Sequence, residues 1–109
     1  INNNKSIINA LKAGEEYVFD AVYRYYFRRL CAFCSQYVSE QEEIEEIVQD
    51  TMMWLWENRA TFVPDTTSSL RQYLITSVKR RCFNVLRRQE KEILEDRGLS
   101  KSRMIIMSL

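Results

Sequence analysis

The chain has 109 residues and a formal net charge of +1, with 46% hydrophobic and 28% charged residues. This length allows one domain with a modest core and is too short for two. A net charge near zero excludes a general attraction to nucleic acid by the whole chain. The sequence has no signal peptide and no apolar run of membrane-spanning length, so we expect a cytoplasmic protein without membrane insertion.

Glycine and proline, which interrupt helices, are rare in this chain. There are two glycines and one proline, and none lies between Gly14 and Pro64. The interval is rich in Glu, Arg, Leu, Gln and Met, which favour helix. We therefore predict an all-α fold, a compact bundle of about four helices.

The first third of the chain contains two of the predicted helices. A short helix over residues 6–13 would end at Gly14, since glycine commonly follows the last helical residue. A second helix over residues 16–37 places apolar side chains at helical spacing. These side chains are Val18, Val22, Tyr26, Leu30 and Phe33.

A third helix is predicted from a capping box at Ser39 and Glu42 to about Asn58. Residues 40–58 contain seven acidic residues and no basic residue. One side of this helix is expected to pack into the bundle and carries Ile44, Ile47, Val48, Thr51 and Leu55. The other side carries Glu42, Glu46, Gln49, Asp50, Met53 and Glu57.

This second side combines one methionine with several acids. A soft apolar anchor ringed by negative charge is typical of a surface that docks a basic partner. Single exposed apolar residues also occur on surfaces that bind nothing, so a merely solvated face remains open at this point. Trp54 and Trp56 point to different sides of the helix, so the same neighbour cannot bury both.

Residues 59–68 form a predicted loop with Pro64 and several short polar residues. Ser69 and Gln72 make a second capping box, which opens a fourth helix. The helical pattern decays after about Glu95 and is broken by Gly98. Residues 70–91 hold seven basic residues and one acid, so the two last helices carry opposite charge.

The fourth helix has an apolar stripe and a basic side. The stripe comprises Leu70, Leu74, Ile75, Val78, Cys82, Val85 and Leu86, and the opposite side carries Tyr73, Thr76, Arg80, Phe83, Asn84 and Arg87. Aromatic rings interleaved with guanidinium groups suit DNA with unstacked bases, because cations bind the phosphates and rings receive the bases. A solvated basic face is the simpler alternative.

The three cysteines, Cys31, Cys34 and Cys82, form an odd set that does not indicate a disulfide framework. The chain has no histidine, so Cys31 and Cys34 would lack two further ligands for zinc. We expect them in the core as small apolar residues. No nucleophile arrangement, glycine-rich phosphate loop or metal-ligand cluster is present, so we predict no enzyme, no catalytic residue and no cofactor.

Two ordered segments resemble bacterial sigma factors. Residues 43–59, EIEEIVQDTMMWLWENR, resemble conserved region 2.2, which grips the RNA polymerase core. Residues 70–88, LRQYLITSVKRRCFNVLRR, resemble regions 2.3 and 2.4, which melt and read the promoter −10 element. The small size and the tryptophan-rich end of the third helix resemble the extracytoplasmic-function group. The resemblance covers about residues 6 to 92.

For the polymerase, the resemblance implies contacts on the acidic helix. Gln49 and Asp50 match the polar pair that contacts the clamp helices of the β′ subunit in the family. Met53 and Glu57 share that face by helical spacing, independently of the resemblance. The predicted polymerase-binding residues are Glu46, Gln49, Asp50, Met53 and Glu57.

For promoter DNA, the resemblance implies contacts on the basic helix and the loop before it. The loop at 62–68 corresponds to one that captures a flipped base of the non-template strand in relatives. Arg80 stands where many relatives have Asn, so the preferred −10 sequence is expected to differ or affinity to rest more on phosphate. The predicted DNA-binding residues are Tyr73, Thr76, Lys79, Arg80, Phe83, Asn84, Arg87 and Arg88.

The resemblance thus implies a transcription initiation factor, with residues 1–95 as region 2 and residues 96–109 as the start of a linker toward region 4. Because the chain opens with Ile1 and region 4 is missing, we expect a piece of a longer protein. An anti-sigma protein is a further partner that the family implies. The alternative is a helical adaptor or regulator that binds proteins only and has no DNA role.

Overall fold

The computed structural model describes residues 5–61 and 67–98 of the chain, with side chains from residue 69 onward in the second range. Within them, four helices follow one another: α1 (Lys5–Lys12), α2 (Glu16–Cys34), α3 (Gln41–Glu57) and α4 (Thr67–Asp96). No strand occurs in these ranges. The predicted all-α bundle of about four helices is confirmed.

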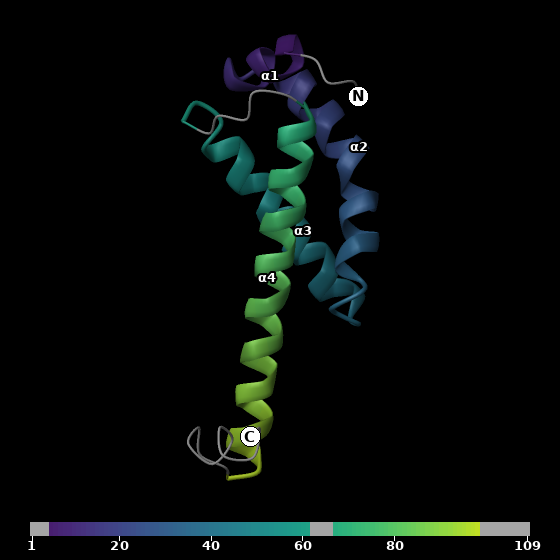
Figure 1. Ribbon diagram of the computed structural model, residues 1–109, viewed down its shortest axis with the longest axis vertical. Coiled ribbons are helices and arrows are strands. Elements are labelled where there is room, and N and C mark those ends of the chain that lie inside the picture. The colour runs from purple at the N-terminus through teal and green to yellow at the C-terminus, as the bar shows by residue number, and fades with distance from the viewer. Residues whose placement is uncertain (1–4, 62–66, 99–109) are drawn as a thin grey trace.

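The long helix α4 is the axis of the bundle (Figure 1). Helices α2 and α3 pack against its N-terminal part, and α1 lies across that end. The C-terminal part of α4 extends past its neighbours, where Ile93 is 52% exposed. Both α3 and α4 therefore keep one side in the bundle and one side toward solvent.

The core draws on all four helices and follows the predicted helical spacing. Every predicted inward residue of α3 is buried, and Met52 joins them. On α4 the stripe is buried except for Ile75 and Leu86, which are half-buried. The fully buried core side chains are Ile8, Val22, Cys34, Val48, Met52, Leu55, Leu70, Leu74, Val78 and Cys82.

Two predicted helix starts were wrong. Helix α3 is capped by Glu40 without a side-chain hydrogen bond, so Ser39 lies one residue outside the cap. Several acids near this end stabilise the helix dipole without a serine cap. Helix α4 already begins at Thr67, which places Ser69 inside the helix instead of at its cap.

Of two predicted helix ends, one was wrong and the other is confirmed. Helix α2 stops at Cys34, before the predicted residue 37, and the chain then turns so that Val38 enters the core. Gly14 ends α1 as predicted, with a φ of +84° that a residue with a side chain rarely adopts. An added Cβ there would lie 3.0 Å from Nε of Arg59.

A pair of thiols joins α2 to α4. The Sγ atoms of Cys34 and Cys82 lie 3.1 Å apart, and neither side chain is exposed. Burial raises the pKa of the Cys34 thiol above its ordinary value of 9.0, and the hydrogen bond with Cys82 raises it further. Cys31 is half-buried against the same core, so the expected apolar role of the cysteines agrees with their positions.

The packing around α4 predicts a contrast between two truncations on that helix. Leu74→Ala should lower the free energy of unfolding by about 2–5 kcal/mol, because it removes a fully buried side chain and leaves a cavity. Ile93→Ala should change it by less than about 0.5 kcal/mol, since that side chain is largely exposed. Urea denaturation of both variants measures the difference. Equal losses would contradict this description of α4.

The buried thiol predicts a fall in stability at alkaline pH. The folded Cys34 stays protonated at pH values where the unfolded thiol ionises, so its stabilisation is complete below pH 9 and declines above it. The decline is about 1.4 kcal/mol per pH unit. Denaturation curves from neutral pH upward should show a shallower decline for Cys34→Ala. An unchanged pH dependence in that variant would rule out the effect.

Candidate protein and nucleic-acid interfaces

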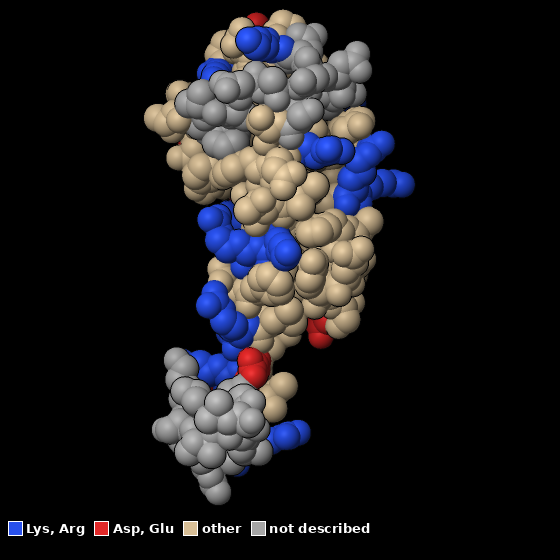
Figure 2. All heavy atoms as spheres, viewed as in Figure 1, with Lys and Arg blue, Asp and Glu red and all other residues tan. Residues whose placement is uncertain are grey.

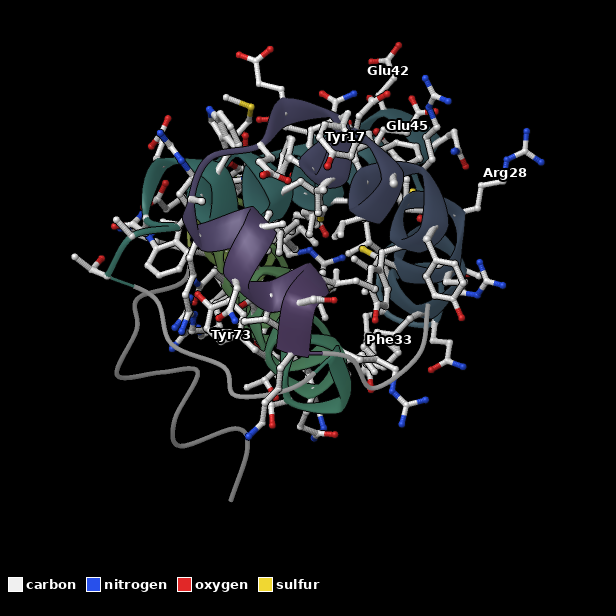
Figure 3. The ribbon with its side chains drawn as sticks, turned by 90° about the horizontal axis from the view of Figure 1, so that it is seen from above. Tyr17, Arg28, Phe33, Glu42, Glu45 and Tyr73 are labelled. Carbon is white, nitrogen blue, oxygen red and sulfur yellow. The ribbon has the colours of Figure 1, made fainter. Side chains whose placement is uncertain are left out.

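The outer side of α3 forms an acidic face. We define it by six residues, all of which are exposed: Glu42, Glu46, Gln49, Asp50, Met53 and Glu57. Viewed along the bundle, Glu42 points away from the domain on the side opposite to Phe33 and Tyr73 (Figure 3). Met53 is 49% exposed, so the apolar centre of this face is accessible to a partner.

Met53 also borders a hollow that the sequence did not reveal. Together with Trp56 of α3 and four residues of α2, it surrounds a volume of about 510 Å³. The α2 residues are Glu16, Tyr17, Phe19 and Asp20. The Phe19 and Trp56 rings are 4.9 Å apart at their centres, which gives the hollow an aromatic floor. Its acidic rim continues the charge of the acidic face.

The two tryptophans face different neighbours, as their spacing predicted. Trp56 packs on Phe19, and the guanidinium of Arg59 lies 4.1 Å from its ring centre. Trp54 instead contacts Tyr73 of α4, with ring centres 5.6 Å apart. Tyr73 is consequently half-buried between α3 and α4, unlike the other residues predicted on the basic side of α4.

The exposed side of α4 forms a basic surface. We define it by six of the eight predicted DNA-binding residues, which line one hollow of about 550 Å³: Thr76, Lys79, Arg80, Phe83, Asn84 and Arg87. Arg87 donates a hydrogen bond to Oδ1 of Asn84, and this bond links a guanidinium group to an amide group within the basic surface. Such a surface combines phosphate-binding cations with groups able to read a base edge.

Phe83 is the aromatic centre of this surface. Its side chain is 43% exposed, and Nζ of Lys79 lies 5.9 Å from the ring centre. The ring of Tyr37, which follows α2, supports Phe83 edge-on at 5.4 Å. Sequence spacing alone could not connect Tyr37 with Phe83, because their contact depends on how α2 and α4 cross.

The acidic face and the basic surface meet between α3 and α4. Arg88 donates to Oε1 of Glu43 at 3.2 Å, which joins the two helices by an ion pair. A hollow of about 160 Å³ beside it is lined by Glu46 and Asp50 from one helix and Asn84 from the other. The eighth predicted DNA-binding residue therefore lies at the border with the acidic face.

Residues 22–92 match the Sigma-70 region 2 family. The chain belongs to that family. Both the acidic face and the basic surface lie within the matched residues. The domain therefore has a sigma-factor-like role in transcription initiation, with the RNA polymerase core and promoter DNA as partners. No curated protein and no solved structure gave a significant match.

Sigma region 2 is a domain of transcription factors that are not enzymes. Across the ranges 5–61 and 67–98, no group of three or more His, Cys, Asp or Glu side chains is arranged to hold a metal ion. No helix within those ranges is both long and apolar enough to cross a membrane. The loop expected to capture a flipped base, at 62–68, lies outside the residues whose side chains are described.

Proposed function

We propose that this domain is region 2 of an extracytoplasmic-function sigma factor, which binds polymerase through α3 and melts the promoter −10 element through α4. The observation that carries the proposal is the placement of two oppositely charged, exposed surfaces on adjacent helices of one bundle. Each surface has its own apolar or aromatic centre, Met53 or Phe83, as expected for two different partners.

The acidic face supports binding to a basic protein. Gln49 and Asp50 are the proposed contacts to the clamp helices of the β′ subunit, with Met53 as an apolar anchor beside them. Glu46 and Glu57 are exposed at the edges of this face, where negative charge steers a basic partner and suppresses others. The adjoining hollow around Trp56 gives the partner a place to bury an apolar side chain.

The basic surface supports capture of the non-template strand. Opening the duplex costs about 1–2 kcal/mol per base-pair step in lost stacking, and a stacked aromatic ring returns about 1–3 kcal/mol per base. Phe83 is exposed and supported by Tyr37, so its ring is available for such stacking. The proposed phosphate contacts are Lys79, Arg80, Arg87 and Arg88. Polymerase supplies the catalysis, and this domain traps the open DNA.

Residues 1–95 constitute region 2, and residues 96–109 begin the linker toward region 4. Helix α4 ends at Asp96, next to the proposed boundary. We place the protein in the cytoplasm, where an anti-sigma protein would cover the same surfaces. A helical adaptor without a DNA role is the competing function, and the DNA experiment below separates the two.

Charge reversal on α3 tests polymerase binding. Asp50→Lys and Glu57→Lys should each weaken binding to core polymerase by about tenfold or more, because they place a positive charge opposite a basic partner. Glu95→Lys makes the same charge change at the far end of α4 and should bind normally. Thermal melts confirm that all three variants fold. Wild-type affinity in both α3 variants would refute the docking surface.

Replacement of Phe83 tests DNA binding. With core polymerase present, the domain should prefer single-stranded −10 non-template oligonucleotides over scrambled strands. Phe83→Ala should reduce that binding by about 1–3 kcal/mol through lost stacking, whereas Phe83→Tyr keeps a ring and should retain most of it. Fluorescence anisotropy of labelled strands measures both effects. Equal affinity of the wild type for scrambled strands would favour the adaptor.

A further inference from the structure

A small recess lies between α2 and α4, beyond the basic surface. Its volume is about 150 Å³, and its lining residues include Tyr25, Tyr26, Arg29, Phe33, Arg71 and Ile75. We call it the arginine recess. Phe33 lies on the side of the domain opposite to Glu42 and Glu45 of α3 (Figure 3). The recess is therefore remote from the acidic face.

Two exposed arginines from different helices converge on this recess. The guanidinium of Arg29 lies 4.0 Å from the centre of the Tyr25 ring, and its Nη1 donates to the Tyr25 carbonyl oxygen at 2.7 Å. These contacts hold Arg29 in place at the edge of the recess. Arg71 enters from α4. Within residues 5–61 and 69–98, neither Arg71 nor Arg29 forms a salt bridge with an acidic side chain.

The two positive charges act on the same neighbour. Burial raises the pKa of the Tyr26 phenol, and the charges of Arg71 and Arg29 oppose that rise. Both arginines line the same recess as Tyr26. Two guanidinium groups that line one recess favour an anion between them, and the planar guanidinium fork matches phosphate oxygens in particular.

A row of aromatic rings connects the recess to the basic surface. Phe33, at the edge of the recess, is 5.5 Å from Tyr37 between ring centres, and Tyr37 is 5.4 Å from Phe83. Lysine and arginine side chains are spread along this face of the molecule over both α4 and α2, and fewer acidic side chains are visible on it (Figure 2). Cations interleaved with rings are typical of surfaces that follow a single strand.

We propose that the DNA-binding surface continues from α4 onto α2, where Arg29 and Arg71 bind backbone phosphates of the same single strand. The proposal rests on the proposed function, because the strand must first be held at Phe83. An acidic protein segment would also suit two arginines. The unbroken row from Phe83 through Tyr37 to Phe33 favours the strand, since it offers stacking positions between the two cationic sites.

A matched pair of double variants tests this inference. Arg29→Gln with Arg71→Gln removes two charges at the recess. The control, Arg24→Gln with Arg28→Gln, removes two charges elsewhere on α2, where Arg24 pairs with Asp20 at 2.8 Å and Arg28 points outward (Figure 3). Binding of a −10 non-template oligonucleotide is measured with core polymerase at several salt concentrations, and thermal melts verify folding.

The plot of log affinity against log salt should be less steep for the recess variant than for the wild type. The difference in slope should be about 1.4, which is the contribution of two single-strand phosphates. Between about 50 and 200 mM salt, the wild type would then lose about sevenfold more affinity than the variant. The control should keep the wild-type slope. If the double variant is unstable, Arg71→Gln alone should lower the slope by about 0.7.

Shortening the strand from each end in turn sharpens the result. When nucleotides are removed from the end that reaches α2, the difference in slope between the wild type and the recess variant should disappear, because the strand no longer contacts the recess. Equal slopes in the wild type and the recess variant would overturn the inference. An equal change in the control variant would also overturn it, because the effect would then come from net charge and not from the recess. Loss of binding in Phe83→Ala alongside either result would leave the proposed function intact.

Discussion

The positions of the charged surfaces of this domain depend on the burial of one apolar stripe along α4. Leu70, Leu74, Val78 and Cys82 are fully buried against α2 and α3, and this burial fixes the rotation of the helix about its axis. Since side chains three or four residues apart share a face, the basic surface is then forced outward. The same constraint on α3 turns its acids away from the core. Charge separation is therefore a consequence of apolar packing.

That separation explains how a chain with a net charge of +1 can have two charged partners. The average charge is irrelevant to an approaching molecule, because ions at physiological salt screen interactions beyond about 8 Å. A partner therefore responds to the nearest helix face. Family membership makes polymerase and promoter DNA the partners of this domain, and the two faces give each of them a separate place in the proposed mechanism.

Much of the fold could be predicted because helical periodicity is a local property. The inward side of α3 was correct at Val48 and at every other predicted position. On α4 the same rule was correct for five of the six residues predicted on the basic side, whereas Tyr73 is half-buried against Trp54. The helix starts at Ser39 and Ser69 were wrong because several acids or an extra turn can serve as well as a serine cap. Contacts such as Cys34 with Cys82 join residues far apart in sequence, and they depend on a crossing geometry that no local pattern encodes.

The ion pair between Glu43 and Arg88 spans the border of the two interfaces. In the proposed mechanism, a phosphate that binds Arg88 breaks the ion pair and leaves Glu43 available to a basic partner. A basic partner that binds Glu43 likewise leaves Arg88 available to a phosphate. Such linkage is reciprocal: each ligand strengthens the other by the same factor. Exposed pairs are worth about 1 kcal/mol or less, which limits this cooperativity to about fivefold. Under the proposed mechanism, the border would thus be a weak thermodynamic link that favours the ternary complex over either binary one.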